Sequence, residues 1–204
     1  VTINGARART FVGRSYMTGL SPNIWSVAGE SADRITNGAI TLSTEVFIQQ
    51  SNGKSVWVFG AQQHYVDISS IITTNDNTVT QAIAIGISQA VIIQGVLVTQ
   101  GNTGNGDINH YISYNGSKTI SYDNYPPTGG GFATTDEISF GKEDIFVVRR
   151  DGTTVSFWIN GLNIYTKTGY TEIFSGSTPT MTRLGGRNNS TNVTPVGMGI
   201  SAYA

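Results

Sequence analysis

Apolar residues recur at every second position along most of this sequence. Such alternation is typical of a β-strand that turns one face toward a hydrophobic core. Near residue 157, one face of the expected strand holds Val155, Phe157 and Ile159, and the other holds Ser156, Trp158 and Asn160. Spacing typical of helices is nearly absent. The pattern therefore predicts an all-β protein.

The alternation divides the chain into many short segments. We expect strands near 10–17, 23–28, 38–50, 54–60, 63–72, 78–88, 90–99, 108–114, 117–123, 143–150, 153–160, 162–168, 180–186 and 195–203. The segment 38–50 is expected to be one strand, with Ile40, Leu42, Val46 and Ile48 sharing a face. The segments 78–88 and 90–99 are apolar on both faces, which is typical of central strands.

Turn signals separate these segments. Asn-Gly pairs begin at positions 52, 115 and 160, and an Asp-Gly pair begins at 151. These pairs tolerate positive φ and therefore favour tight hairpins. Many short strands with regular turns indicate a β-sandwich or barrel.

Length and composition narrow the class of protein. The 204 residues suffice for one sizeable core, and with no repeat or linker we expect 1–204 to be a single domain. The hydrophobic share of 38% is too high for a disordered chain. A net charge of -1 argues against a nucleic-acid partner. No apolar run approaches the roughly 20 residues of a membrane span, so membrane insertion is not expected.

The stretch 142–169, KEDIFVVRRDGTTVSFWINGLNIYTKTG, resembles the hairpins of laminin-G-like domains. That family has a strand ending in a basic residue, an Asp-Gly turn, a strand with an aromatic near its end, then Asn-Gly and a third strand. The matching positions here are Arg149, Arg150, Asp151, Gly152, Phe157, Trp158, Asn160 and Gly161. AITLSTEVFI upstream and MTRLGGRNN and VGMGISAYA downstream resemble other strands of the family. The chain is thus similar to the laminin-G and concanavalin-A-like superfamily, which implies an antiparallel jelly-roll sandwich.

The resemblance implies several functions. Members bind glycans or proteins, bind sugars through a metal, or hydrolyse sugar chains, and similar sandwiches occur in phage tail fibres, spikes and other virion proteins. The cysteine-free, charge-poor composition, rich in Asn, Thr and Gly, fits the last group. We therefore expect an extracellular or virion-surface location with other virion or surface proteins as partners, and a symmetric homo-oligomer is compatible with such assemblies.

Hydrolysis of a glycosidic bond normally needs two carboxylates, and laminarinase-like members carry them as Glu-x-Asp-x-x-Glu on one strand. No acidic residue here is followed by another at i+2, the spacing that would place both side chains on one face of a strand. The same gap removes the metal-ligand pair of legume lectins. The chain also lacks cysteine and a Gly-x-Ser-x-Gly elbow, so a nucleophilic triad is not expected. The sequence predicts a protein that is not an enzyme.

Sugars are commonly held by aromatic faces beside amide and carboxylate groups. Around one expected hairpin the chain carries His110, Asp123 and Tyr125, whereas alternation turns Tyr114 and Tyr122 inward. Trp158 lies on the polar face of its strand, and the polar loop 187–194 adds Asn188. We take His110, Asp123, Tyr125, Trp158 and Asn188 as candidate ligand-binding residues, although ordinary sheet packing also explains the aromatic ones.

A cation site is a further candidate. Asn105, Asp107 and Asn109 supply oxygen donors at alternate positions of one loop, and oxygen donors are the ligands that calcium prefers. An ordinary Gly/Asn loop explains the same residues. His64 is interpreted as a structural histidine.

These observations favour a non-catalytic binding or adhesion module that recognises a glycan or a cell-surface receptor, within a phage tail fibre, spike or bacterial surface protein. The first alternative is a structural virion or assembly protein that makes protein contacts. The second alternative is a polysaccharide hydrolase whose carboxylates come from separate strands.

Overall fold

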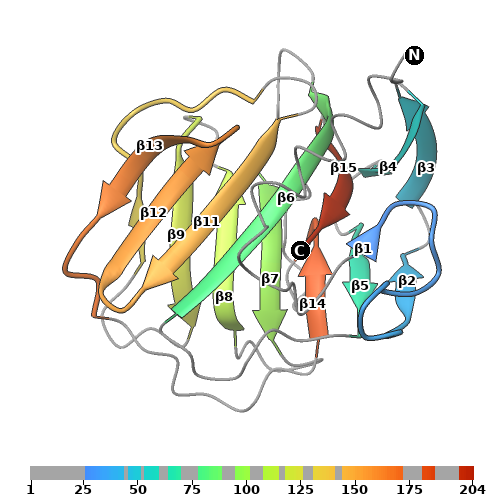
Figure 1. The fold of residues 1–204 in the computed structure, drawn as a ribbon, viewed down its shortest axis with the longest axis horizontal. Coiled ribbons are helices and arrows are strands. Elements are labelled where there is room, and N and C mark those ends of the chain that lie inside the picture. Colours follow the sequence, from blue (N-terminus) through green and yellow to red (C-terminus); the bar gives the residue numbers. More distant parts are fainter. Residues whose placement is uncertain are drawn as a thin grey trace, which may run out of the picture.

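A computed structural model describes residues 26–43, 46–51, 53–59, 64–69, 78–88, 95–101, 108–114, 118–125, 131–140, 144–171, 181–186 and 198–204. Within these ranges the chain forms strands and no helix, and the strands build two antiparallel sheets that pack face to face (Figure 1). The predicted all-β sandwich is confirmed. No helix in the described part of the chain has the length and hydrophobicity that crossing a membrane requires.

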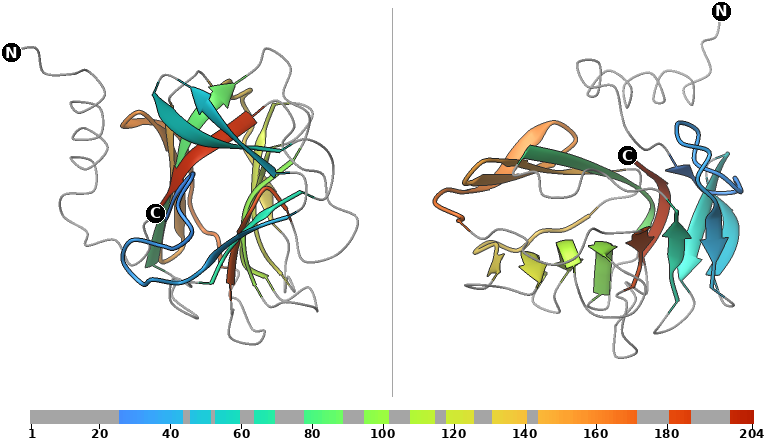
Figure 2. Two further views of the ribbon diagram at one scale, coloured as in Figure 1. Left: turned by 90° about the vertical axis from the view of Figure 1, so that its right-hand side faces the viewer. Right: turned by 90° about the horizontal axis from the view of Figure 1, so that it is seen from below.

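The first layer is an eight-stranded sheet. Its order is β13 (Leu162–Lys167), β12 (Thr154–Ile159), β11 (Ile145–Asp151), β6 (Thr78–Ser88), β15 (Met198–Tyr203), β4 (Lys54–Phe59) and β3 (Val46–Ser51), and β1 (Ser26–Val27) pairs with β15. The second layer is a seven-stranded sheet. Its order is β10 (Phe132–Ala133), β9 (Ile120–Tyr125), β8 (Ile108–Tyr114), β7 (Gly95–Gly101), β14 (Met181–Leu184), β5 (Val66–Ile68) and β2 (Ile40–Leu42). Figure 2 shows the two layers from the side.

The predicted hairpins form where the turn pairs indicated them. Gly53, Gly152 and Gly161 adopt φ of +73°, +58° and +83°, and Asn160 adopts a φ of 51°. These residues connect β3 to β4, β11 to β12 and β12 to β13. The Asn-Gly pair at 115 lies outside the described residues.

The expectation of one strand over 38–50 is wrong. β2 joins the seven-stranded sheet and β3 joins the eight-stranded sheet, so the chain changes layer between them. Ser43 marks the departure, because its backbone N–H donates to the carbonyl of Tyr65 and its Oγ accepts from the Tyr65 N–H. Ile48, which was expected to share the buried face, is 48% exposed on the outermost strand of its sheet. Alternation did not reveal the change of layer, because Ile40, Leu42, Val46 and Ile48 all stand at even-numbered positions, as they would along one continuous strand.

The two strands with apolar residues on both faces are both central, but they belong to different layers. β6 lies between β11 and β15, and β7 lies between β8 and β14. β10 was not predicted, because two residues are too short for alternation to show. The strand expected over 10–17 lies outside the described residues.

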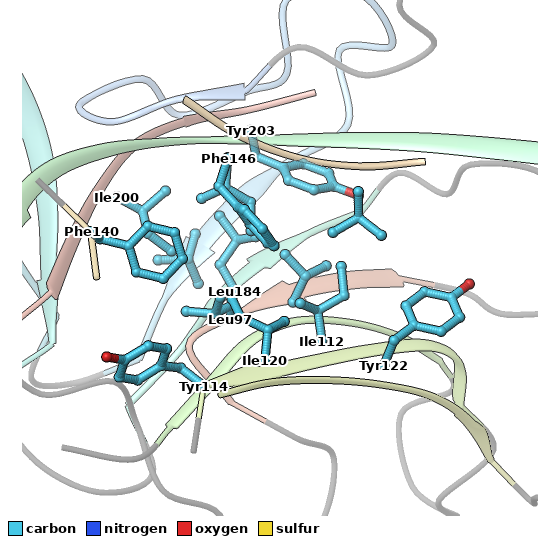
Figure 3. Close-up of a cluster of buried hydrophobic side chains, with 14 of the residues drawn as sticks. Leu97, Ile112, Tyr114, Ile120, Tyr122, Phe140, Phe146, Leu184, Ile200 and Tyr203 are labelled. Carbon is cyan, nitrogen blue, oxygen red and sulfur yellow. The ribbon is translucent and has the colours of Figure 1, made fainter. Parts of the chain in front are cut away.

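Side chains from the two inner faces fill the space between the sheets (Figure 3). Leu97, Ile112 and Leu184 come from the seven-stranded sheet and meet Phe146 and Ile200 from the other sheet. Tyr114 and Tyr122 also point inward, with exposed fractions of 3% and 0%, as alternation predicted. This core fixes the hairpins of β11, β12 and β13 on one side of the sandwich.

Two fully buried tyrosines make the fold sensitive to alkaline pH. Burial raises the pKa of Tyr122, an effect that the nearby Arg150 partly opposes, and burial also raises the pKa of Tyr203. Both phenols therefore stay protonated in the fold at a pH where the unfolded chain loses their protons. Their contribution to stability is complete below the ordinary tyrosine pKa of about 10 and declines as the pH rises above it.

We therefore expect the urea midpoint of unfolding to fall as the pH rises from about 9 to about 11. The fall should become smaller in Tyr203→Phe, which has no phenol to ionise at that position. Chemical denaturation followed by far-ultraviolet circular dichroism at each pH measures both effects. An unchanged midpoint over this interval contradicts the prediction.

Candidate functional site

The hairpin of β11 and β12 separates its side chains into a buried set and an outward set. Phe146, Val148, Val155 and Phe157 have exposed fractions of 1% or less and face the core. The intervening residues face outward from the eight-stranded sheet, away from the other layer. The outward positions of this hairpin include Arg149, Asp151, Thr154, Ser156 and Trp158, and Val147 lies opposite Trp158.

Strand register places these outward residues side by side. Asp151 lies opposite Thr154, and Arg149 lies opposite Ser156. Ser156 in turn lies opposite Thr166 of β13. Together with Trp158 they line an open hollow of about 340 Å³, within the size range of small-molecule sites. We refer to these six residues as the hairpin hollow.

Trp158 forms one side of the hairpin hollow. Its side chain is half-buried, and its indole Nε1–H donates to Oγ of Ser156 at 3.1 Å. Because Ser156 precedes it by two residues on the same face, this bond holds the indole along the strand. An aromatic ring fixed in this way offers a surface on which a ligand can stack.

A bulge in the pairing of β12 with β13 lies beside Trp158. Phe157 pairs with Tyr165 and Trp158 pairs with Asn163, so β13 carries one additional residue. Asn163 Nδ2 lies 3.4 Å from the carbonyl oxygens of Phe157 and of Tyr165, and its Oδ1 accepts from the Thr166 hydroxyl at 3.2 Å. Bulges are frequent beside binding sites because they redirect side chains. Here the bulge lies at the edge of the hairpin hollow.

Arg149 and Asp151 supply the charges of the hairpin hollow. Arg149 Nη2 donates to Asp151 Oδ2 at 2.8 Å, and the two side chains are 55% and 58% exposed. An ion pair this exposed contributes little to stability, about 0 to 1 kcal/mol. Both groups can therefore turn toward a ligand with little cost to the fold.

The neighbouring arginine has a different role. Arg150 faces inward and is 2% exposed. Its guanidinium lies 5.0 Å from the ring centre of Tyr170, and its Nε donates to the Gly152 carbonyl at 3.2 Å. Arg150 therefore supports the hairpin turn from beneath, whereas Arg149 is available at the surface.

Other candidate residues lie in the opposite layer. Asp123 and Tyr125 belong to β9, and Asn109 and His110 belong to β8, all in the seven-stranded sheet. Tyr125 pairs with Ile108 and Asp123 pairs with Tyr111, so Asn109 and His110 face a single residue of β9 across a bulge. The backbone thus brings these four residues to one end of β8 and β9. It does not bring them to Trp158.

The remaining predicted positions are Asn105, Asp107 and Asn188, which lie outside the described residues. Among the residues that are described, no three His, Asp or Glu side chains are grouped as a metal site would require. Calcium binding by Asn105, Asp107 and Asn109 stays a prediction. His64 is buried just before β5, in keeping with its interpretation as a structural residue.

The sequence pattern alone did not mark Arg149, Asp151, Thr154, Ser156 or Thr166 as site residues. The signal was present in the alternation of β11. Once Phe146 and Val148 are placed inward, Arg149 and Asp151 must face outward together. The Asp-Gly turn at 151 then sets the register that places them against β12.

Solved structures with a similar fold are found for this chain, but the comparisons assign it to no protein family. No protein-family model matches the sequence, and no curated protein matches it. Among solved structures, domain 4 of an extracellular arabinanase from Geobacillus stearothermophilus, in complex with arabinotriose, superposes with a TM-score of 0.63 at 14% identity, over 89% of each chain. A structure of botulinum neurotoxin type C, whose cell entry depends on interaction with two ganglioside molecules, gives a TM-score of 0.61 at 10% identity.

A sialidase from Trypanosoma rangeli is a further structural relative, with a TM-score of 0.59 at 12% identity. The match covers 88% of this chain in both the neurotoxin and the sialidase, but only 46% and 30% of those chains. At these identities the similarity establishes a shared β-sandwich. The function of this chain rests on its own residues.

Proposed function

We propose that this chain is a glycan-binding module and that the hairpin hollow holds the sugar. The observation that carries the proposal is an indole fixed along the sheet surface next to hydroxyls and an exposed ion pair. Aromatic rings pack on the C–H surfaces of sugars, and a few well-placed polar groups set their orientation. The hollow combines both features within one hairpin and its neighbouring strand.

Each polar group of the hollow suits a sugar hydroxyl. The Arg149 guanidinium donates hydrogen bonds and the Asp151 carboxylate accepts them, while the hydroxyls of Thr154 and Ser156 can do either. These groups lie on the same face of the sheet as Trp158, so the strand register brings their backbone positions together before a ligand arrives. Preorganised groups bind with a smaller loss of conformational entropy.

The lining favours binding over hydrolysis. Among the described residues, Asp151 is the only carboxylate in the hairpin hollow. The usual mechanism of glycoside hydrolysis requires two carboxylates, one on each side of the scissile bond. We therefore propose a non-catalytic role. Incubation with a panel of polysaccharides tests it, and release of reducing sugar would contradict it.

The structural relatives and the composition support this role and suggest its setting. The arabinanase domain was solved with arabinotriose, and the neurotoxin structure concerns ganglioside interaction. We place the module outside the cell, in a phage tail fibre, spike or bacterial surface protein, because a charge-poor composition rich in Asn, Thr and Gly fits such proteins.

Replacing Trp158 by alanine tests the proposal. We expect affinity for the glycans that the wild-type chain selects on an array to fall at least about tenfold, equivalent to about 1.4 kcal/mol, because the stacking surface is lost. Phe47→Ala is the matched control, since it removes a 59% exposed aromatic from β3, away from the hollow. Isothermal titration calorimetry measures the affinities. Equal affinities of Trp158→Ala and wild type contradict the proposal.

A Tyr125→Ala variant separates this site from the predicted site on β8 and β9. If the hairpin hollow binds the glycan, Tyr125→Ala keeps the wild-type affinity. Loss of binding in Tyr125→Ala together with normal binding in Trp158→Ala assigns the ligand to the seven-stranded sheet instead.

A further inference from the structure

We infer that the hairpin hollow selects a neutral sugar that carries two adjacent hydroxyls and discriminates against acidic sugars. The inference rests on the proposed glycan-binding function and specifies its ligand class. It follows from the pairing of one guanidinium with one carboxylate in a lining that is otherwise uncharged.

The charges in the hairpin hollow balance each other. Arg149 and Asp151 together carry no net charge, and Thr154, Ser156, Trp158 and Thr166 complete the lining. An arginine without a partner is a strong site for a carboxylate, because its fork donates two parallel hydrogen bonds. Here Asp151 already occupies Nη2 of Arg149 at 2.8 Å. A sugar carboxylate that approached Arg149 would be repelled by the Asp151 carboxylate beside it.

The spacing of the ion pair matches the spacing of two neighbouring sugar hydroxyls. The donor Nη2 and the acceptor Oδ2 lie next to each other, and both side chains are more than half exposed. Adjacent hydroxyls of a sugar ring are separated by roughly a hydrogen-bond length. One hydroxyl can therefore accept from the guanidinium while its neighbour donates to the carboxylate. This arrangement requires a neutral diol, because both charges of the pair then gain a complementary partner.

The surrounding residues fix the orientation of the diol. Thr154 lies opposite Asp151 and Ser156 lies opposite Arg149, so each charged group has a hydroxyl beside it on β12. Trp158 follows Ser156 by two residues on the same face and offers its ring to the apolar side of the sugar. The ring plane and the ion pair together define two sides of one sugar-binding subsite.

The test compares two sugars and two charge variants by isothermal titration calorimetry. The probes are arabinotriose as the neutral trisaccharide and trigalacturonic acid, in which every ring carries a carboxylate, as the acidic one. We expect the wild-type chain to bind the neutral probe at least about tenfold more tightly. Asp151→Asn should lower the affinity for the neutral probe and raise the affinity for the acidic probe, so that the preference between the two probes reverses. Glu137→Gln is the matched control, since it removes a 73% exposed carboxylate paired with Lys118, away from the hollow.

The outcomes separate the inference from the proposed function. Tighter binding of the acidic probe by wild type, lost in Trp158→Ala, overturns the inference and leaves glycan binding in place. An Asp151→Asn variant with the wild-type preference also overturns the inference. Binding of both probes that Trp158→Ala leaves unchanged overturns the proposed function itself, as does the absence of binding to any glycan on the array.

Discussion

Replacing Phe157 by alanine is expected to lower the free energy of unfolding by about 3 to 5 kcal/mol. The Phe157 ring is fully buried, and it lies 5.9 Å from the rings of Phe132, Phe146 and Tyr165. These aromatic residues come from both sheets and hold the hairpin of β11 and β12 against the seven-stranded layer. Alanine leaves a cavity among large rings that cannot collapse to fill it, which adds to the lost burial of the ring itself.

The adjacent residue provides the contrast. Trp158 follows Phe157 directly but faces outward, so Trp158→Ala should cost no more than about 1.5 kcal/mol of stability, near the typical effect of a single substitution. Urea denaturation of both variants measures the two values. Phe157→Ala should lose much of its stability although Phe157 does not touch the glycan. Trp158→Ala should stay folded and lose affinity for the glycan. Equal losses of stability contradict the assignment of these residues to opposite faces.

Replacing Arg183 by alanine is expected to destabilise the protein by about 3 to 5 kcal/mol. Arg183 is 9% exposed on β14 and makes a two-pronged contact with Asp67 of β5, from Nε to Oδ1 at 2.6 Å and from Nη2 to Oδ2 at 2.7 Å. Its guanidinium also lies 3.6 Å from the ring centre of Tyr65. Alanine removes the cation and leaves the Asp67 carboxylate, whose side chain is 19% exposed, without it.

A double-mutant cycle tests this explanation. If the loss comes from the stranded carboxylate, Asp67→Asn should recover part of the stability when it is combined with Arg183→Ala. Arg149→Ala is the control, because it breaks an exposed ion pair and should cost at most about 1 kcal/mol. Chemical denaturation of the wild type, the two single variants Arg183→Ala and Asp67→Asn, and the double variant gives the coupling energy. An Arg183→Ala effect as small as that of Arg149→Ala contradicts a structural role for the Arg183 pair.

The sequence predicts the β11–β13 region well because local signals agree there. Positive φ at Gly152 and Asn160 fixes both turns, and each turn fixes the register of the strands beside it. Alternation then places Phe157 inward and Trp158 outward. In this region the turn chemistry and the hydrophobic pattern determine the same structure, so little depends on distant parts of the chain.

Elsewhere the arrangement depends on contacts between distant residues. The change of layer at Ser43 is held by Tyr65, which is 22 residues away. The assignment of β6 and β7 to different sheets depends on their partners β15 and β14, far along the sequence. Alternation within a strand does not state which strand lies beside it. These features could not be derived from the local pattern alone.

The candidate site was predicted in part. Alternation placed Trp158 on an outward face, and the structure confirms that position while its role in binding stays a proposal. Arg149 and Asp151 entered the sequence analysis only as positions that match the laminin-G-like hairpin, in which a basic residue precedes an Asp-Gly turn. They were not predicted to bind a ligand. Their pairing with each other and their position against Ser156 become evident only when register joins β11 to β12.

Binding of a sugar against Trp158 can be observed through the indole N–H signals in a nuclear magnetic resonance titration. The sequence contains three tryptophans, and Trp57 is fully buried on β4. On adding arabinotriose, or the neutral glycan selected on the array, we expect the Trp158 indole N–H signal to shift progressively while the Trp57 signal stays fixed. Saturable binding that leaves the Trp158 signal unchanged would show that the sugar binds outside the hairpin hollow and would contradict the proposed site.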